Sequence, residues 1–435
     1  MNLRRWLRPG IGVKRWLAVA FVGLTGLALA GALALRQLYR EVEVEGPAQA
    51  VIWVITLQFL PYWVRAAVLL GLGIFLFGYG SYRVVRALLG PFTESTEEPL
   101  VDLVYRRRLL ARGPRVVAIG GGTGLSVLLR GLKQHTANLT AIVSVADDGG
   151  STGRLREQLG IPAVGDIRNC LVAMAETEPA MGELLQYRFG ADEGGLSGHA
   201  VGNLLITAMN AIGGGDFEAA VRQMNRVLAV RGSVVPASGT ALTLHARLRD
   251  GSEVVGQSRV MRMRGIERVW LEPGEVRASR DALRAIAEAD VVVLGPGSLY
   301  TSLLATILLP ELRAALAATP ALRVYVANVA TQSGETEGYD LSDHVEALAA
   351  HGVGDVLDVV LANSHLGAGP DAELGVPVKL RWPPMGVARR LRLVLDDVVD
   401  PANPHHHDPE LLAAALLRLV GREAGSRHGG IARTA

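Results

Sequence analysis

The chain has 435 residues, with 44 lysines and arginines against 42 aspartates and glutamates, and a formal net charge of +2. This balance gives no electrostatic case for nucleic-acid binding, and an aromatic content of 5% excludes an extended base-stacking surface. The single cysteine, Cys170, excludes an internal disulfide and a cysteine-based zinc site, and we expect it to be a small buried residue.

Residues 1–90 account for the high mean hydropathy of +0.27 and are predicted to form a transmembrane helical hairpin. Residues 16–35 are uncharged and long enough to cross a hydrocarbon core of about 30 Å. A second apolar segment, 59–82, carries Arg65 near its outer end, where a long side chain reaches the headgroups. Lysines and arginines flank both outer ends, whereas glutamates lie in the loop between the segments. The positive-inside rule therefore predicts a protein of the inner (plasma) membrane with its main domain in the cytoplasm.

The rest of the chain divides into a linker, one large domain and a short tail. Residues 91–113 are polar and then basic, which fits either a solvated connector or a helix near anionic lipid. Residues 114–425 form the predicted main domain, and residues 426–435 the C-terminal tail.

Short β-branched runs alternate with helical patterns from residue 115 onward. The predicted buried strands are 116–120, 140–145, 291–294, 323–328 and 356–363, and the predicted helices are 126–135, 203–212, 279–289 and 342–351. Strands separated by helices indicate an α/β fold with a doubly wound, mostly parallel sheet, whose ligand sites lie at the carboxyl ends of the strands. Residues 239–260 alternate around Arg249-Asp250-Gly251, which predicts a small antiparallel insert.

The first predicted strand runs into a glycine-rich turn at Gly120, Gly121, Gly122, Thr123 and Gly124, and a helix follows directly. Backbone N–H groups and the positive end of a helix make such a turn an anion site, to which the Thr123 hydroxyl adds a donor. The turn is neither a Walker A loop nor a strict dinucleotide fingerprint, because Leu125 occupies the place of the third glycine. A tight packing turn is the alternative interpretation.

The second strand leads to Asp147 and Asp148, and a later segment adds Asp166, Arg168 and Asn169. Paired carboxylates beside a phosphate site bind either a ribose or a Mg²⁺ ion that bridges to phosphate oxygens, and the Arg168 guanidinium suits phosphate. Alternatively, the two adjacent aspartates only stabilise a turn and cap the helix that follows it.

A third loop repeats the strand-to-helix pattern with Gly295, Gly297 and Ser298, and Tyr300 and Thr301 lie in the first turn of its helix. We predict that Ser298 caps this helix. Two such loops in one parallel sheet converge on one crevice and bind both ends of a diphosphate.

Several polar residues outside these loops are also candidates for a binding or a structural role. Asn328, at the end of a later strand, and Asn203 are added to the expected ligand site, whereas His199 is expected to be structural. The triplet His405–His407 resembles a metal tract, but Asp408 and Pro409 follow it as N-cap and first helical residue, so we predict a loop before a terminal helix.

These segments occur in the same order as in the gluconeogenesis factor family, which the chain closely resembles over residues 114–425. The matching segments are GGGTGLSVLLRGLK, VADDGGSTGRLR, GDIRNCL, GHAVGNLL, GPGSLYTS and NVATQSGET with GYDLSDH. The family is related to 2-phospho-L-lactate transferase, which joins a phospholactyl group to a deazaflavin precursor.

The resemblance implies a Rossmann-like fold, a nucleotide-diphosphate site that in this branch takes a UDP-sugar, and control of cell shape and envelope synthesis during gluconeogenic growth. The transferase branch also implies a divalent metal, with Asp148 and Asp166 as the best-matching positions for Mg²⁺, although GDIRNCL departs from the transferase pattern.

Three functions therefore compete: a membrane-tethered nucleotide-sugar-binding regulator, a metal-assisted transferase, and an NAD-dependent oxidoreductase, which the broken glycine fingerprint disfavours. The first of them is the leading interpretation. The expected partners are a UDP-sugar or related nucleotide diphosphate and the membrane, with no nucleic acid, and a homo-oligomer is left open.

Overall fold

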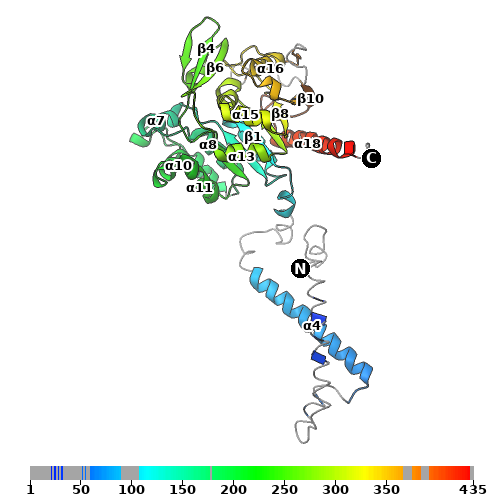
Figure 1. The fold of residues 1–435 in the computed structure, drawn as a ribbon. Coiled ribbons are helices and arrows are strands. Elements are labelled where there is room, and N and C mark those ends of the chain that lie inside the picture. Colours follow the sequence, from blue (N-terminus) through cyan, green and yellow to red (C-terminus); the bar gives the residue numbers. More distant parts are fainter. Residues whose placement is uncertain are drawn as a thin grey trace. The chain divides into compact units, whose positions relative to one another are not determined.

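The computed structural model describes residues 59–89, 107–176, 179–365, 375–383 and 391–431, together with scattered residues between 21 and 54. The chain separates into two compact units, Met1–Leu109 and Leu110–Ala435. Figure 1 shows the elements of both units. Each unit is considered by itself below.

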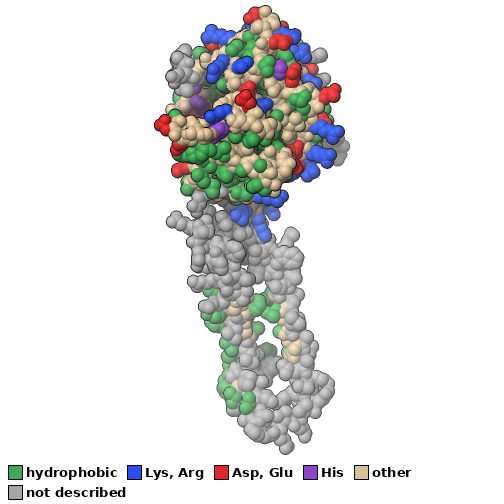
Figure 2. Space-filling model, turned by 90° about the vertical axis from the view of Figure 1, so that its left-hand side faces the viewer, with side chains coloured by type: hydrophobic (Ala, Val, Ile, Leu, Met, Phe, Trp, Pro, Cys, Tyr) green, Lys and Arg blue, Asp and Glu red, His purple; other side chains and the backbone are tan. Residues whose placement is uncertain are grey.

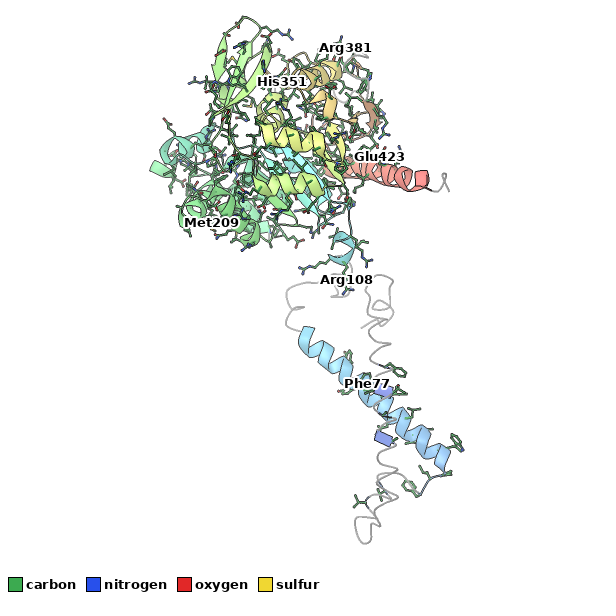
Figure 3. The ribbon with its side chains drawn as sticks, in the orientation of Figure 1. Phe77, Arg108, Met209, His351, Arg381 and Glu423 are labelled. Carbon is green, nitrogen blue, oxygen red and sulfur yellow. The ribbon has the colours of Figure 1, made fainter. Side chains whose placement is uncertain are left out.

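The first unit contains the 28-residue helix α4, Tyr62–Leu89. Its described apolar side chains are exposed, with Trp63 81%, Phe75 66% and Ile74 60% accessible. Figure 2 shows hydrophobic side chains over the described part of this unit, and Figure 3 labels Phe77 on the helix. No single helix among the described residues is long and apolar enough to span a membrane. The predicted segment 16–35 lies mostly outside the described residues.

The second unit is built on a seven-stranded sheet in the order β10-β9-β8-β7-β1-β2-β3, in which every pair of neighbours is parallel. Its strands are β1 Val116–Gly120, β2 Leu139–Val143, β3 Ser233–Pro236, β7 Val291–Leu294, β8 Leu322–Val326, β9 Val359–Asn363 and β10 Arg392–Asp396. All residues of β1, β7 and β9 are buried, because helices cover both faces of the sheet. The predicted mostly parallel α/β fold is confirmed.

A separate three-stranded antiparallel sheet has the order β5-β4-β6. Its strands are β4 Thr243–Leu248, β5 Glu253–Val255 and β6 Ile266–Glu272. The turn between β4 and β5 falls at residues 249–252, so the predicted hairpin and antiparallel insert are confirmed. A short helix, α12 Gln257–Val260, connects β5 to β6.

Helices cover the two faces of the large sheet. They are α6 Gly122–Leu132, α7 Gly150–Leu159, α8 Gly165–Met174, α9 Pro179–Gln186, α10 Val201–Ile212, α11 Phe217–Val227, α13 Arg280–Glu288, α14 Ala305–Ile307, α15 Pro310–Ala318, α16 Leu341–Ala350 and α18 Pro409–Ile431, with short turns η2 Gly194–Leu196 and η4 Gly354–Val356 and the π-helix η3 Leu299–Leu304. Helix α6 packs against α8 and α18, whereas α13 pairs with α15, which Figure 1 shows in front of the strands.

The bent pair formed by residues 299–307 and α15 passes the length and composition test for a membrane span, with an angle of 77° between its halves. Its side chains Leu303, Leu312 and Leu316 are nevertheless buried in the core of the second unit. The apolar composition of this pair is therefore explained by its burial in the interior of the domain.

The contact between α6 and α18 fixes the C-terminal helix against the sheet. Gly131 of α6 lies so close to the start of α18 that a Cβ atom on it would collide with the Pro409 carbonyl and approach the Ala413 Cβ to 3.0 Å. Asp408 begins α18 by accepting hydrogen bonds of 2.8 Å from the Glu410 and Leu411 N–H groups, so the predicted cap is confirmed.

We predict that Gly131→Ala destabilises the domain by about 1–3 kcal/mol, because the added methyl group overpacks the α6–α18 contact. The matched control is Gly421→Ala within α18, where a Cβ meets no atom within 4 Å. Alanine has the higher helix propensity, so this control should raise stability by about 1 kcal/mol. Denaturant unfolding measures both changes, and equal effects of the two substitutions would contradict this packing.

Candidate functional site

The order of the large sheet places a switch point between β7 and β1. From β1 the chain proceeds outward through β2 to β3, and from β7 it proceeds in the opposite direction through β8 and β9 to β10. In open α/β sheets, ligands bind in the crevice at the carboxyl ends of the strands beside such a point. A pocket of about 740 Å³ lies there, lined by both glycine-rich loops.

The two glycine-rich loops meet at the floor of this pocket. A Cβ atom on Gly124 would lie 2.9 Å from the Pro296 carbonyl oxygen and 3.0 Å from the Gly297 Cα. A Cβ atom on Gly297 would in turn lie 3.1 Å from the Gly121 carbonyl oxygen. Side chains at these positions would force the loops apart, which is the physical reason for glycine in both.

Helix α6 begins at Gly122, so Gly122, Thr123 and Gly124 form its first turn, whereas Gly120 ends β1 and Gly121 is the N-cap residue. The Asp166 carboxyl group lies beside this first turn, where the nearby Gly122 N–H lowers its pKa, and Ser126 donates to the Gly122 carbonyl at 3.1 Å. Thr123 and Gly124 follow within the same turn, where N–H groups have no partner inside the helix, and both residues line the pocket. These positions carry the strongest anion-binding geometry of the site.

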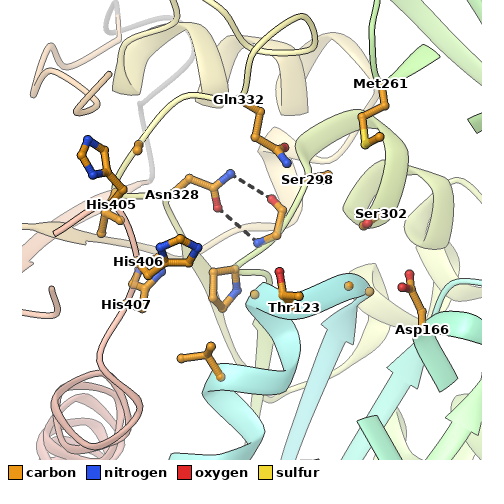
Figure 4. A pocket seen from close by; sticks show the side chains of 18 of the residues that line it. Thr123, Asp166, Met261, Ser298, Ser302, Asn328, Gln332, His405, His406 and His407 are labelled. Carbon is orange, nitrogen blue, oxygen red and sulfur yellow. Dashed lines mark hydrogen bonds between the residues drawn. The ribbon is translucent and has the colours of Figure 1, made fainter. Parts of the chain in front are cut away.

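The second loop is held by side chains of the protein itself. Asn328 accepts the Gly297 N–H at 3.2 Å and donates to the Gly297 carbonyl at 3.0 Å, as the dashed lines in Figure 4 show. Ser298 stands at the N-cap position of η3, as predicted, although its side chain forms no capping hydrogen bond.

Glu335 performs the capping role instead. Its carboxylate accepts the Tyr300 N–H at 2.5 Å, the Thr301 N–H at 3.1 Å and the Thr301 hydroxyl at 2.8 Å. Tyr300 and Thr301 are buried and lie outside the pocket lining. The positive end of η3 is therefore already paired with an internal carboxylate.

The three aspartates near the pocket have different surroundings. Asp147 and Asp166 line the pocket, whereas Asp148 accepts the Ser258 N–H at 2.8 Å and faces away from it. Burial, followed by the charge of Asp147, raises the pKa of Asp166 to about 7. Burial also raises the pKa of Asp147, against the hydrogen bond from the Gly149 N–H. The carboxyl pair at the pocket is therefore Asp147 with Asp166, where the sequence favoured Asp148 with Asp166.

Arg168 and Asn203 lie behind the pocket wall and do not line it. Arg168 donates to the Asn203 side chain at 3.1 Å and to the Asn169 side chain at 2.9 Å. Asn203 donates to Ser151, whose hydroxyl is 3.0 Å from the His199 ring. This network orients Asn169, which does line the pocket, and gives His199 the structural role predicted for it. Gly295 likewise lies outside the lining.

Several lining residues were absent from the sequence-based set. They are Gln257, Met261 and Arg262 beside the antiparallel insert, Thr331, Gln332 and Ser333 after β8, and His405, His406 and His407. Figure 4 shows the histidines and Asp166 at opposite ends of the pocket. The histidine triplet is the predicted loop before α18, and the packing of α18 on α6 brings it to the pocket.

The histidines do not form a metal centre in this structure. Burial lowers the pKa of His407 to about 4, and its Nε2 lies 3.2 Å from the Ala327 carbonyl oxygen, so the ring is neutral and structural. Within the described residues, no group of three or more histidine, cysteine or acidic side chains is placed to hold a metal ion.

The family model described as 2-phospho-L-lactate transferase CofD matches residues 116–373. A relative from Nostoc sp. (strain PCC 7120) is 41% identical over 440 residues, which cover 98% of this chain and 93% of the relative. The chain belongs to the gluconeogenesis factor family.

Two further comparisons agree with this membership. The gluconeogenesis factor of Bacillus subtilis (strain 168) is 46% identical over 256 residues, which cover 59% of this chain and 80% of that protein. The crystal structure of a UPF0052 family member from Bacillus halodurans has a TM-score of 0.64 at 42% identity, and the match covers 70% of this chain and 99% of that one. The α/β fold and the CofD-like domain are thus shared with proteins of this family.

We predict that Asp166→Asn changes how stability depends on pH. Between about pH 4 and pH 7 folded Asp166 retains a proton that the unfolded chain has released, so its contribution to stability falls as pH rises. Asparagine carries no such proton and keeps an oxygen for the Gly122 N–H. The free energy of unfolding of the variant, relative to the natural chain, should therefore rise by roughly 2–3 kcal/mol from pH 5 to pH 8.

Asp250→Asn is the control with the opposite sign. Hydrogen bonds from Ser252 lower the pKa of the exposed Asp250 carboxyl, so this variant should lose relative stability as pH rises through the acid range. Urea unfolding across the pH range measures both variants. Parallel curves for Asp166→Asn and the natural chain would show that Asp166 is ionised throughout.

Proposed function

We propose that the chain is a nucleotide-sugar-binding regulator that takes a UDP-sugar in the pocket at the β7–β1 switch point. Its role would be to control cell shape and envelope synthesis during growth on gluconeogenic carbon sources. The observation that carries the proposal is the junction of the two glycine-rich loops at the start of α6. Relatives named gluconeogenesis factor support the link to gluconeogenic growth.

The geometry favours a diphosphate on the first loop. The first turn of α6 offers N–H groups and the positive end of the helix dipole at Thr123 and Gly124. Neutral polar side chains of Asn169, Thr331 and Gln332 line the same pocket, and they suit the hydroxyl and amide groups of a nucleotide sugar. The pocket of about 740 Å³ falls in the usual range for small-molecule sites.

The surroundings of Asp147 and Asp166 favour ligand binding without catalysis. Two ionised carboxylates beside a diphosphate would repel it, but Asp166 holds a proton up to about neutral pH and also orders the Gly122 N–H. Asp147 similarly orders the Gly149 N–H at 3.0 Å. Both carboxyl groups thus have a loop-ordering role that requires no cation.

A metal-assisted transferase is the second candidate, favoured by the same two residues. Asp147 and Asp166 provide the one or two carboxylates with which a protein usually holds Mg²⁺ beside a phosphate, so the residues fit such an ion. A bound Mg²⁺ would neutralise charge on the phosphoryl group. In this candidate the α6 N–H groups would orient the diphosphate and Asn169 would contact the donor.

The first unit is proposed to hold the protein at the inner face of the plasma membrane, with the second unit in the cytoplasm. Helix α4 supports this through exposed apolar side chains such as Trp63, Leu70 and Phe75. Arg83 and Arg86 follow the apolar part of the helix and suit a cytoplasmic end.

We predict that Thr123→Asp abolishes binding of UDP-N-acetylglucosamine, because a carboxylate at this position occupies the place of the phosphate and repels it. An acidic residue is favourable in the first turn of a helix, so the fold should be retained. Thr123→Asn is the matched control, of the same size but neutral, and should bind within about threefold of the natural chain. Isothermal titration measures both. Tight binding by a folded Thr123→Asp variant would contradict the proposed site.

The effect of Mg²⁺ on binding distinguishes the two candidate functions, regulator and transferase. We expect the affinity for UDP-N-acetylglucosamine to be the same with Mg²⁺ and with EDTA, and no UDP to be released over time. The opposite result would support the transferase: a metal-dependent gain in affinity that Asp147→Asn removes and the control Asp148→Asn leaves unchanged, accompanied by slow UDP release.

Membrane attachment is tested by fractionation of cells that express the natural chain or residues 110–435. The natural chain should sediment with membranes, because its apolar helix is buried in lipid, and the truncated chain should not. Both should bind UDP-N-acetylglucosamine equally. Recovery of the natural chain away from the membranes would contradict the anchor, and loss of binding by a folded truncated chain would contradict the division of roles.

A further inference from the structure

A second cavity, of about 420 Å³, lies between strand β6, the start of α15 and the end of α16. It shares no lining residue with the pocket at the switch point. The residues used in the following argument are Arg268, Trp270, Pro310, Arg313, His351 and Gly352. Figure 3 labels His351, which lies beside the antiparallel sheet.

Two arginines in this cavity have no acidic partner among the described residues. Arg268 lies directly opposite Arg247 in the β4–β6 pairing, and Arg247 is already paired with Glu253 at 2.8 Å. Like charges at opposite positions in a sheet are destabilising. Arg313 projects from the first turns of α15, where its guanidinium lies near Gly352. The two exposed guanidiniums thus border the same cavity, Arg268 from β6 and Arg313 from α15, without a carboxylate partner among the described residues.

The other walls add to the positive character of the cavity. Pro310 is the first residue of α15, so the positive end of this nine-residue helix borders the cavity. Glu311, the acidic residue of its first turn, accepts the Ala278 N–H at 2.8 Å and does not line the cavity. No acidic side chain occurs in the lining.

His351 fixes one wall without contributing a charge. Its Nδ1 lies 2.7 Å from the Ala347 carbonyl oxygen, and its Nε2 accepts the Val269 N–H at 3.0 Å. An imidazole that donates at one nitrogen and accepts at the other is neutral. This bridge ties the end of α16 to β6, so the wall that carries Arg268 and the wall that carries Gly352 are held at a fixed separation.

Trp270 supplies a flat surface beside the two arginines. Its ring stacks on His245, with 5.4 Å between centroids, and the Arg247 guanidinium lies 5.9 Å from its centroid. An indole next to uncompensated cations suits a ligand with an anionic group and a small planar or apolar part.

We propose that this cavity is a second ligand site, which binds a small anionic metabolite through a phosphate or carboxylate group held between Arg268 and Arg313. The site is independent of the proposed nucleotide site, because it uses different residues. The segment from Ser298 to Pro310 nevertheless connects the two, since Ser298 lines the first pocket and Pro310 the second.

The test uses the intrinsic fluorescence of Trp270 in the full chain. Inorganic pyrophosphate and citrate serve as the phosphate and carboxylate probes, and subtraction of the signal of Trp270→Phe isolates the contribution of this ring. The variant is Arg268→Gln with Arg313→Gln, and the matched control is Arg284→Gln, an exposed arginine of α13 beside Asp281. Each single glutamine variant is measured as well, in case the double variant fails to fold.

We expect a saturable change with at least one probe. The double variant should weaken it by at least about tenfold and each single variant by about threefold, while Arg284→Gln leaves it unchanged. A response to pyrophosphate alone assigns a phosphate ligand, and a response to citrate alone a carboxylate ligand. The proposal is overturned if neither probe gives a saturable change, if potassium chloride of equal ionic strength reproduces it, or if it survives the arginine substitutions. None of these outcomes depends on UDP-sugar binding at the first pocket.

Discussion

The close contact between the two glycine-rich loops is the constraint on which the functional half of the structure depends. Parallel pairing of β1 with β7 brings the ends of both strands to one edge, and Gly124 then has room only for a hydrogen atom beside Pro296 and Gly297. A side chain at this contact would separate the loops and open the floor of the pocket. Asn328 holds the second loop through two hydrogen bonds to Gly297, and Asp166 lies beside Gly122 of the first loop.

Internal anions decide which helix ends remain available to a ligand. Glu335 pairs with the start of η3, and Asp408 with the start of α18. The first turn of α6 has the Asp166 carboxyl group beside Gly122, and its residues Thr123 and Gly124 line the pocket. In the proposed site the first loop would bind the anion and the second would support it, a distinction that matters because both loops have the same glycine-rich composition.

The fold was predictable where local pattern and tertiary structure agree. Strands β1 and β7 are continuous β-branched runs between turn residues, and their predicted bounds match the structure. The site was less predictable, because neighbours in sequence point in different directions. Asp147 lines the pocket while Asp148 binds the Ser258 N–H, since Gly256 lets the insert approach it closely. Capping of η3 by Glu335 depends on a residue 34 or more positions away in the chain, and no local signal indicates it. The arrival of His405–His407 at the pocket likewise depends on the contact at Gly131.

A crystal structure of the full chain grown with UDP-N-acetylglucosamine is the most direct test of the claim that the two loops form an anion site. The account predicts the diphosphate at the first turn of α6, within hydrogen-bond distance of the Thr123 and Gly124 N–H groups, with Asn169 and Asn328 at its sides. Ordered nucleotide bound anywhere else on the domain, with the first turn of α6 free of it, would contradict the account.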